Sequence, residues 1–340
     1  MPETLRLDPQ RAGDLDRAAA LLRGGGTVAF PTETVYGLGA NALNASAVAK
    51  IFEAKERPAW DPLIVHIASA EELPDITAID TPLRAVVYRL AEEFWPGPLT
   101  LLLPRTSVIP KIVTAGRPLV GVRVPGHPVA LELIRRARVP IAAPSANRFG
   151  HTSPTSMSHV LADLDGRIDA VLDAGPSFVG VESTVLDPAN MVIYRPGAVT
   201  QAEIERLCGA VVTIYTPPRE LGKDMAMPSP GVGIRHYAPR AKVVLTQGSR
   251  QALLHGLESA VGEKTGVMLP EGWEIHALDP KPEVYVWGRW DRQEQLAARL
   301  FAGLRELDER GVDRILCPLP PGGGLGQAIR DRLDKAARDA

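Results

Sequence analysis

The sequence predicts an α/β protein with two domains. The chain has 340 residues, which is more than a typical single domain contains. Short apolar runs alternate with helical patterns in both halves, and a stretch rich in proline and glycine lies between them. We therefore expect one domain over residues 1–215, a linker over 216–240 and a second domain over 241–340.

The composition limits the class of function. Hydrophobic residues make up 45% of the chain and charged residues 23%, as in ordinary globular proteins. A formal net charge of −2 argues against a protein that mainly grips nucleic acid through its phosphates, although local basic patches remain possible. Because the chain has neither an apolar run of about 18 residues nor a signal-peptide core, we expect a soluble cytoplasmic protein with no membrane partner.

The two cysteines, Cys208 and Cys317, fall in different predicted domains. Their spacing fits neither a metal site nor a disulfide framework. We expect both to be buried, reduced thiols.

In the first half, apolar runs bounded by proline, glycine or polar residues predict strands, and apolar faces at helical spacing predict helices. Strands are expected at 27–30, 63–67, 99–103, 119–124, 139–143, 170–173, 183–187 and 191–194. Helices are expected at 15–23, 44–54, 70–75, 82–94 and 200–207, with Asn44 as the N-cap of the second and Thr155 as the N-cap of a further helix after residue 155.

The second half alternates strands and helices, which is typical of a small α/β domain with a parallel sheet. Strands are expected at 242–245, 266–269, 284–287 and 313–317, and helices at 249–260, 291–310 and 326–338. The turn at 320–327 is rich in glycine but lacks the spacing of a dinucleotide-binding loop, so we assign no nucleotide to it.

Two cations stand where the helix over 44–54 gives way to a loop. Lys55 and Arg57 lie two residues apart, and Pro58 follows them. Such a pair can aim positive charge at a phosphate or carboxylate, with the planar fork of arginine beside the point charge of lysine. The alternative is a pair of solvated charges at a helix C-terminus, where cations are favoured in any protein.

Two loops at strand ends carry hydroxyl groups and glycines. The first, 31–39, follows a strand and contains three threonine or tyrosine hydroxyls before its glycines. The second, 144–155, combines hydroxyls, an asparagine and cations. Loops of this kind can cradle a phosphate, and ligands of α/β proteins sit at strand ends. The alternative for the first loop is an ordinary turn with a buried Tyr36.

Two strands carry one polar side chain each within an apolar run. Arg123 needs an anionic partner there, which can be an internal carboxylate or a bound acid. His66 faces the same side as Ile64, opposite Val65 and Ile67, and is either structural or a ligand contact.

The first 200 residues show no Ser-His-Asp order, no metal-ligand cluster, no paired carboxylates and no Walker A loop. This pattern favours catalysis by positioning and charge stabilisation, as in nucleotidyl transfer, over catalysis by a protein nucleophile.

Several motifs, in this order along the chain, resemble those of the YrdC/Sua5 family. They are PTETVYGLGANA (31–42), KERPAWDPLIVH (55–66), PSANRFGHTSPT (144–155), ESTV (182–185), YRPG (194–197) and PSPGVGIRHYAP (228–239). The last motif and the small α/β domain after it resemble the longer, Sua5-type members. The resemblance implies a YrdC-like twisted mixed sheet with helices, joined by a linker to a small Rossmann-like domain.

The resemblance also implies an activity. Members of this kind combine L-threonine, bicarbonate or CO₂, and ATP with Mg²⁺ into threonylcarbamoyl-AMP and pyrophosphate. A partner transferase complex then modifies position 37 of tRNA, so no strong direct contact with nucleic acid is expected. The alternatives are a nucleotide- or RNA-binding module without turnover, and a carbamoyl-adenylate enzyme of the hydrogenase-maturing type, which would require a much longer chain with a zinc finger.

The resemblance assigns roles to individual residues. The catalytic set corresponds to Lys55, Arg57, Ser145 and Asn147. The threonine contacts correspond to Thr34, His66, Arg123, Ala143 and Ser183. The ATP contacts correspond to Arg57, Asp61, Leu119, Ser145, Ser153, Arg195 and Tyr237. Family members often carry asparagine where Asp61 stands, and magnesium is expected to be bound through ATP and not by protein side chains.

We predict that the linker over 228–239 acts as a lid in which Tyr237 covers the nucleotide and excludes water. Tyr237→Ala, or deletion of 228–239, should therefore lower the yield of the adenylate, because the intermediates hydrolyse readily. Product analysis after incubation with the substrates measures this yield. Unchanged turnover in either variant would contradict the lid.

Overall fold

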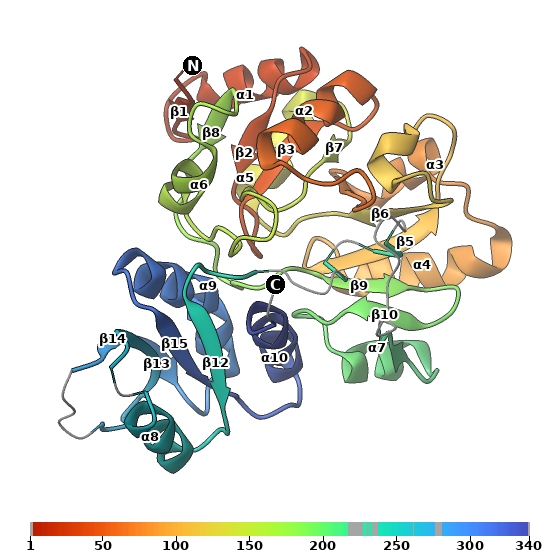
Figure 1. Ribbon diagram of the computed structural model, residues 1–340. Coiled ribbons are helices and arrows are strands. Elements are labelled where there is room, and N and C mark those ends of the chain that lie inside the picture. Colours follow the sequence, from red (N-terminus) through yellow and green to blue (C-terminus); the bar gives the residue numbers. More distant parts are fainter. Residues whose placement is uncertain are drawn as a thin grey trace. The chain divides into compact units, whose positions relative to one another are not determined.

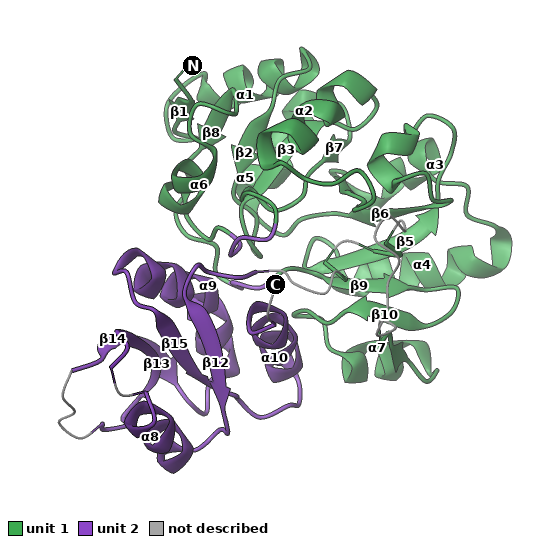
Figure 2. Cartoon of the chain, viewed as in Figure 1, with its two compact units in different colours: residues 1–149, 154–178, 182–233 green, residues 150–153, 179–181, 234–340 purple. Residues whose placement is uncertain are grey.

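The computed structural model describes residues 3–216, 227–229, 231–232, 237–260, 262–275 and 281–338. The chain forms two compact units (Figure 2). Unit 1 comprises residues 1–149, 154–178 and 182–233, and unit 2 comprises 150–153, 179–181 and 234–340. Two short segments of the predicted first domain therefore belong to the same unit as the predicted second domain. A single linker between two domains does not anticipate this division.

Unit 1 is built on a mixed sheet (Figure 1), as the family resemblance implies. Its order among the described residues is β1 (Leu5–Leu7), β8 (Ala170–Leu172), β2 (Val28–Phe30), β3 (Gly37–Asn41), β7 (Ile141–Ala142), β4 (Ile64–His66), β6 (Leu119–Arg123), β5 (Leu99–Pro104), β9 (Thr184–Asp187), β10 (Val192–Arg195) and β11 (Thr213–Ile214). β4 and β6 are parallel, whereas β7 and β5 run antiparallel to them on either side.

Helices cover both faces of this sheet. They are α1 (Asp14–Arg23), α2 (Ala45–Lys55), α3 (Leu73–Ile76), α4 (Thr81–Phe94), α5 (Pro128–Ala137), α6 (Met157–Leu164) and α7 (Gln201–Cys208), with 3-10 turns at Ala70–Glu72 and Lys111–Thr114. One apolar core contains residues of α2 and α4, and the other contains residues of α1 and α5. Ala29 belongs to the first core, whereas its neighbours Val28 and Phe30 belong to the second, so the cores lie on opposite faces.

Unit 1 differs from the prediction in several elements. The strands β1, β3 and β11 are not anticipated. The helix expected at 70–75 is a 3-10 turn followed by the short α3. Thr155 does not cap the next helix, because the side chain of Ser156 accepts the capping bond of α6. α5 is not anticipated, although Pro128 at its first turn and its apolar residues at helical spacing are helix signals.

Unit 2 contains a parallel sheet, as expected. Its order is β12 (Lys242–Thr246), β15 (Arg314–Pro318), β13 (Thr265–Glu271) and β14 (Glu283–Arg289), and every pair is parallel. The helices are α8 (Arg250–Glu258), α9 (Gln293–Glu309) and α10 (Leu325–Ala336). The leucines on one face of α9 are buried, namely Leu296, Leu300, Leu304 and Leu307. The carbonyl of Leu296 also accepts a hydrogen bond of 2.7 Å from the indole of Trp287.

Met227, within the predicted linker, forms hydrogen bonds inside unit 1. The amide of Met227 donates to the carbonyl of Trp60 at 3.0 Å, and Arg117 Nε donates to the carbonyl of Met227 at 3.0 Å. Residues 230 and 233–236 of the predicted lid lie outside the described residues, so the lid stays a prediction. Among the residues that the structure describes, no helix has the length and apolar character needed to span a bilayer.

Asn44 caps α2, as predicted, by accepting hydrogen bonds from the amides of Ser46 at 3.0 Å and Ala47 at 3.2 Å. α2 ends at Lys55, where Glu56 adopts a left-handed conformation. The cap therefore fixes the helix that delivers Lys55.

We predict that Asn44→Ala lowers the free energy of unfolding by about 1 kcal/mol, because two amides at the helix start lose their acceptor. Asn44→Asp keeps an acceptor and should change stability by less than about half of that amount. Denaturant titration of the three proteins measures the difference. Equal destabilisation by both substitutions would contradict a capping role.

Candidate active site

Four adjacent strands of unit 1 place polar side chains on one face of the sheet. Val65, Leu101 and Val122 point into the core with α2 and α4, so the alternating residues point to the opposite face. These residues are His66 on β4, Arg123 on β6, Thr100 on β5 and Ser183 immediately before β9. His66 and Arg123 are direct partners in the β4–β6 register. Ala143, whose amide donates to the carbonyl of Ile64 at 2.9 Å, packs in the core on the same face.

Arg123 is buried and held by three groups of its own chain. Its Nε donates to the carbonyl of Gly97 at 3.1 Å, and its Nη1 donates to Thr34 Oγ1 at 3.1 Å. Its Nη2 lies 2.5 Å from Glu33 Oε1 as an ion pair. The sequence left open whether the anion would be internal or bound, and the structure places an internal carboxylate there.

His66 is a buried, neutral imidazole. Burial, and then the positive charge of Arg123, lower the pKa of His66 to about 3. Its ring meets Phe30 edge to face, with centroids 6.3 Å apart, which confirms the side that alternation predicts. Its Nδ1 has no hydrogen-bond partner among the described residues. A neutral ring nitrogen of this kind can contact a substrate hydroxyl without adding charge.

Ser183 connects the predicted threonine and ATP contacts. Its hydroxyl lies 2.8 Å from that of Thr100 and accepts a hydrogen bond of 3.1 Å from Arg195 Nη2. Arg195 Nε also donates to the carbonyl of Ser183 at 3.0 Å. These residues are buried, so the two predicted contact sets meet at one point.

Lys55 joins the members of the predicted catalytic set through the backbone. Its Nζ donates to the carbonyl of Ser145 at 2.6 Å and to the carbonyl of Asn147. The amide of Phe149 returns a bond of 2.8 Å to the carbonyl of Lys55. Burial, and then repulsion by Arg57, lower the pKa of Lys55 well below its ordinary value. Two of the three donors of the ammonium group are thus used internally.

The loops 31–42 and 144–155 lie side by side. Gly37 pairs with Ser145 in an isolated antiparallel bridge, and the amide of Ala146 donates to the carbonyl of Tyr36 at 2.8 Å. Tyr36 is buried, and its hydroxyl donates to the carbonyl of Gly175 at 2.7 Å. Tyr36 is therefore buried, as in the alternative of an ordinary turn. The same loop also contains the polar residues that a ligand-binding loop requires.

Arg57 and Asp61 form a buried pair. Arg57 Nη2 lies 2.9 Å from Asp61 Oδ2 and also donates to the carbonyl of Pro62 at 2.8 Å, while Nε donates to the carbonyl of Asp61 at 3.1 Å. Lys55 and Arg57 are 1% and 8% exposed, so the alternative of two solvated charges is wrong. Burial raises the pKa of Asp61 more than the attraction of Arg57 and Lys55 lowers it.

The remaining predicted ATP contacts are Leu119, Ser153 and Tyr237. Leu119 begins β6, which Arg123 ends, so the two residues stand about 13 Å apart along the strand. Ser153 and Tyr237 belong to unit 2. The ring of Tyr237 packs 5.6 Å from that of Phe301 and under the guanidinium of Arg332 at 5.4 Å.

Sequence reasoning missed Glu33, Gly97 and Thr100. Glu33 lies inside a motif that the sequence singled out, and an acid between two threonines was its only signal. Thr100 interrupts an apolar strand in the same way as Arg123, which is a usable signal. Gly97 acts through its carbonyl, which no sequence pattern reveals.

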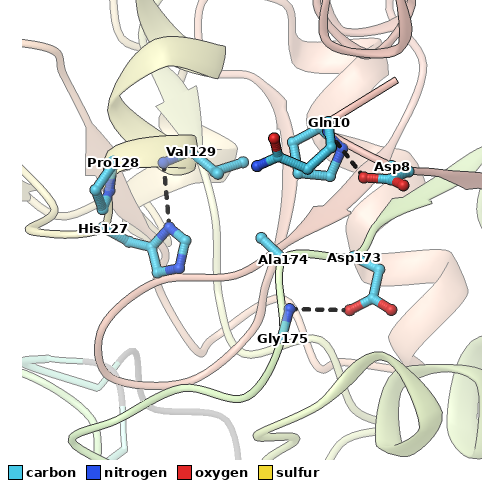
Figure 3. A pocket seen from close by; sticks show the side chains of 9 residues that line it. Asp8, Gln10, His127, Pro128, Val129, Asp173, Ala174 and Gly175 are labelled. Carbon is cyan, nitrogen blue, oxygen red and sulfur yellow. Dashed lines mark hydrogen bonds between the residues drawn. The ribbon is translucent and has the colours of Figure 1, made fainter. Parts of the chain in front are cut away.

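A separate pocket of about 580 Å³ in unit 1 has none of the predicted site residues in its lining (Figure 3). It is lined by Asp8, Pro9, Gln10, His127, Pro128, Val129, Asp173, Ala174 and Gly175. His127 Nδ1 accepts the amide of Val129 at 3.2 Å, and Asp173 Oδ1 accepts the amide of Gly175 at 3.1 Å. These bonds cap a helix and close a turn, so they account for the polar groups without a ligand.

The described residues contain no group of three or more histidine, cysteine or acidic side chains that could hold a metal ion. Asp61 Oδ1 is a buried carboxylate oxygen without a hydrogen-bond partner among these residues. This donor set fits a magnesium ion held mainly by phosphate oxygens better than a cage of protein ligands.

The His66 environment predicts a loss of stability in acid. The folded pKa is about 3 and the ordinary value is 6.5, so between these values the unfolded chain binds a proton that the folded protein does not. Stability therefore falls as pH is lowered through this window, by about 2 kcal/mol between pH 7 and pH 5. His66→Gln should lose about 2 kcal/mol less than the parent protein over that range.

Urea titration at both pH values, followed by hydrogen exchange of peptides from unit 1, measures this difference. Other titrating groups contribute equally to both proteins and cancel. The same pH dependence in His66→Gln and in the parent would contradict a buried neutral imidazole.

Comparison with known proteins identifies the family. The Sua5/YciO/YrdC family model, described as telomere recombination, matches residues 20–197, and the model described as the C-terminal domain of threonylcarbamoyl-AMP synthase matches 199–338. The threonylcarbamoyl-AMP synthase of Pyrococcus abyssi is 44% identical over 94% of this chain and 93% of the relative. The enzyme of the same name from Bacillus subtilis is 45% identical over 97% and 93%.

A solved structure agrees with these matches. The crystal structure of P. abyssi Sua5 complexed with L-threonine has 41% sequence identity and a TM-score of 0.88, and the match covers 99% of this chain and 98% of that one. The fold, the two matched models and the near full-length relatives lead to one conclusion. The chain belongs to the Sua5/YciO/YrdC family and carries the Sua5-type C-terminal domain.

Proposed function

We propose that this chain is a threonylcarbamoyl-AMP synthase, a nucleotidyltransferase that joins L-threonine, bicarbonate or CO₂, and ATP. The observation that carries the proposal is similarity over more than nine-tenths of the chain to two relatives of that name. The products are threonylcarbamoyl-AMP and pyrophosphate. A downstream transferase complex would use the adenylate to modify position 37 of tRNA.

The amino-acid side of the proposal uses the polar face of the sheet. Arg123 offers a guanidinium fixed by Gly97 and Thr34, which suits the carboxylate of threonine. The neutral ring of His66 and the hydroxyl of Ser183 lie on the same face and supply uncharged contacts for the rest of a small polar substrate.

The nucleotide side uses the cations at the end of α2. Lys55 keeps one N–H beyond its two internal bonds, and Arg57 is fixed by its own loop. Both can therefore stabilise charge on phosphate without first being ordered. Magnesium, brought by ATP, would neutralise charge on the phosphate oxygens.

The chemistry follows in two steps. The neutral amine of threonine forms a C–N bond to the carbon of CO₂ or bicarbonate and becomes a carbamate, with loss of a proton and, from bicarbonate, of hydroxide. A carbamate oxygen then attacks the α-phosphorus in line, and the bond to pyrophosphate breaks. Burial of Lys55, Arg123 and Ser183 supports a site that excludes water from both labile intermediates.

An omission assay tests the proposal. We predict that pyrophosphate release from ATP and Mg²⁺ requires both L-threonine and bicarbonate, and that leaving out either lowers the rate by at least about tenfold, because the attacking carbamate cannot then form.

The same assay separates the rival function. Tight ATP binding without threonine-dependent release would favour a nucleotide-binding module and contradict the synthase. Release with threonine absent would indicate simple ATP hydrolysis, which also contradicts it.

A further inference from the structure

Glu33 is a buried carboxylate with an incomplete set of partners. Its residue is 2% exposed, and its Oε1 forms an ion pair of 2.5 Å with Arg123 Nη2. Among the described residues, neither oxygen of the Glu33 carboxylate accepts an aligned hydrogen bond. Arg123 Nη2 likewise donates no aligned hydrogen bond. The two charged groups are therefore close together, but the hydrogen-bonding capacity of their facing atoms is not satisfied.

The buried Glu33 carboxylate lacks hydrogen-bond donors. An ionised carboxylate has about four lone-pair sites, and burial without hydrogen bonds costs several kcal/mol. Most buried side-chain oxygens are satisfied for this reason, and exceptions require an explanation. The missing group should carry several N–H donors and a positive charge.

Glycine backbone packs beside the carboxylate. Gly126 lies next to Glu33, and a Cβ at position 126 would come within 3.4 Å of both Cδ and Oε1 of Glu33. Gly97, whose carbonyl holds Arg123, lies beside Gly126. The carboxylate therefore meets the backbone of Gly126 on this side and not a side chain at that position.

An α-amino acid completes this pair. It carries a carboxylate and an ammonium group on one carbon, and the ammonium group has three donors. If the substrate carboxylate contacts Arg123, the ammonium group can reach the adjacent Glu33. The Glu33–Arg123 pair and the zwitterion are each neutral, so their union buries no uncompensated charge.

We propose that Glu33 binds the α-ammonium group of the amino-acid substrate and that Glu33 and Arg123 together form a clamp for the zwitterion. This inference rests on the proposed function, because it concerns the same amino-acid site. The clamp selects amino acids over hydroxy acids, which Arg123 alone does not do. A hydroxy acid can bind Arg123 through its carboxylate, but it has no ammonium group to donate to Glu33.

Calorimetric binding of two ligands tests the clamp. The ligands are L-threonine and 3-hydroxybutanoate, which keeps the carboxylate and hydroxyl but lacks the amine. The proteins are the parent, Glu33→Gln and the control Glu203→Gln. Glu203 belongs to the capping box of α7, where glutamine also functions, so the control removes one carboxylate outside the site.

In the parent, threonine should bind at least about tenfold more tightly than 3-hydroxybutanoate. Glu33→Gln should weaken threonine binding by about 10- to 100-fold, because a charge-assisted contact to the ammonium group is lost. It should leave 3-hydroxybutanoate binding unchanged or tighter, because the buried carboxylate no longer competes for Arg123. The control should match the parent for both ligands.

Other outcomes overturn the inference. Equal weakening of both ligands would show that Glu33 only holds Arg123 in place. Unchanged threonine binding in Glu33→Gln would remove the ammonium contact while leaving the proposed function intact. If that variant does not fold, equal affinity of the parent for the two ligands overturns the clamp by itself. A parent that binds no threonine would overturn the proposed function as well.

Discussion

The hydrogen bonds of Lys55 to the carbonyls of Ser145 and Asn147 organise the site. Burying an ammonium group costs several kcal/mol, and two charge-assisted hydrogen bonds of about 1.5–3 kcal/mol each offset much of that cost. The same bonds tie the end of α2 to the loop over 144–155, which in turn pairs with the loop that contains Gly37. Loss of the lysine would leave two carbonyls without their donor and would release both loops.

Two buried arginines of the site are paired with carboxylates of the same chain. Arg57 is paired with Asp61, and Arg123 is paired with Glu33. The position of Asp61, which is unexpected beside phosphates, follows from this pairing, because the carboxylate holds the guanidinium in place before any ligand binds. An anionic substrate that binds either arginine must then share it with an internal carboxylate. Binding that also satisfies the carboxylate is favoured over binding that displaces it.

The sequence could predict features that depend on local pattern. Alternation placed His66 on the correct face, and Asn44 before an apolar face marked the start of α2. It could not predict Glu33 as the partner of Arg123, because the two residues are 90 positions apart and only the folded loop brings them together. For the same reason, the sequence could not show that Lys55 contacts the backbone carbonyls of Ser145 and Asn147.

The loop over 144–155 is divided between the two units. Its early residues hold Lys55 in unit 1, whereas 150–153 pack in unit 2, where Gly150 accepts the amide of Ala238 at 2.9 Å and Thr152 accepts a hydrogen bond from Arg305. Residues 150–153 and 179–181 are therefore part of the packing of unit 2, and removal of the rest of that unit would leave them without it.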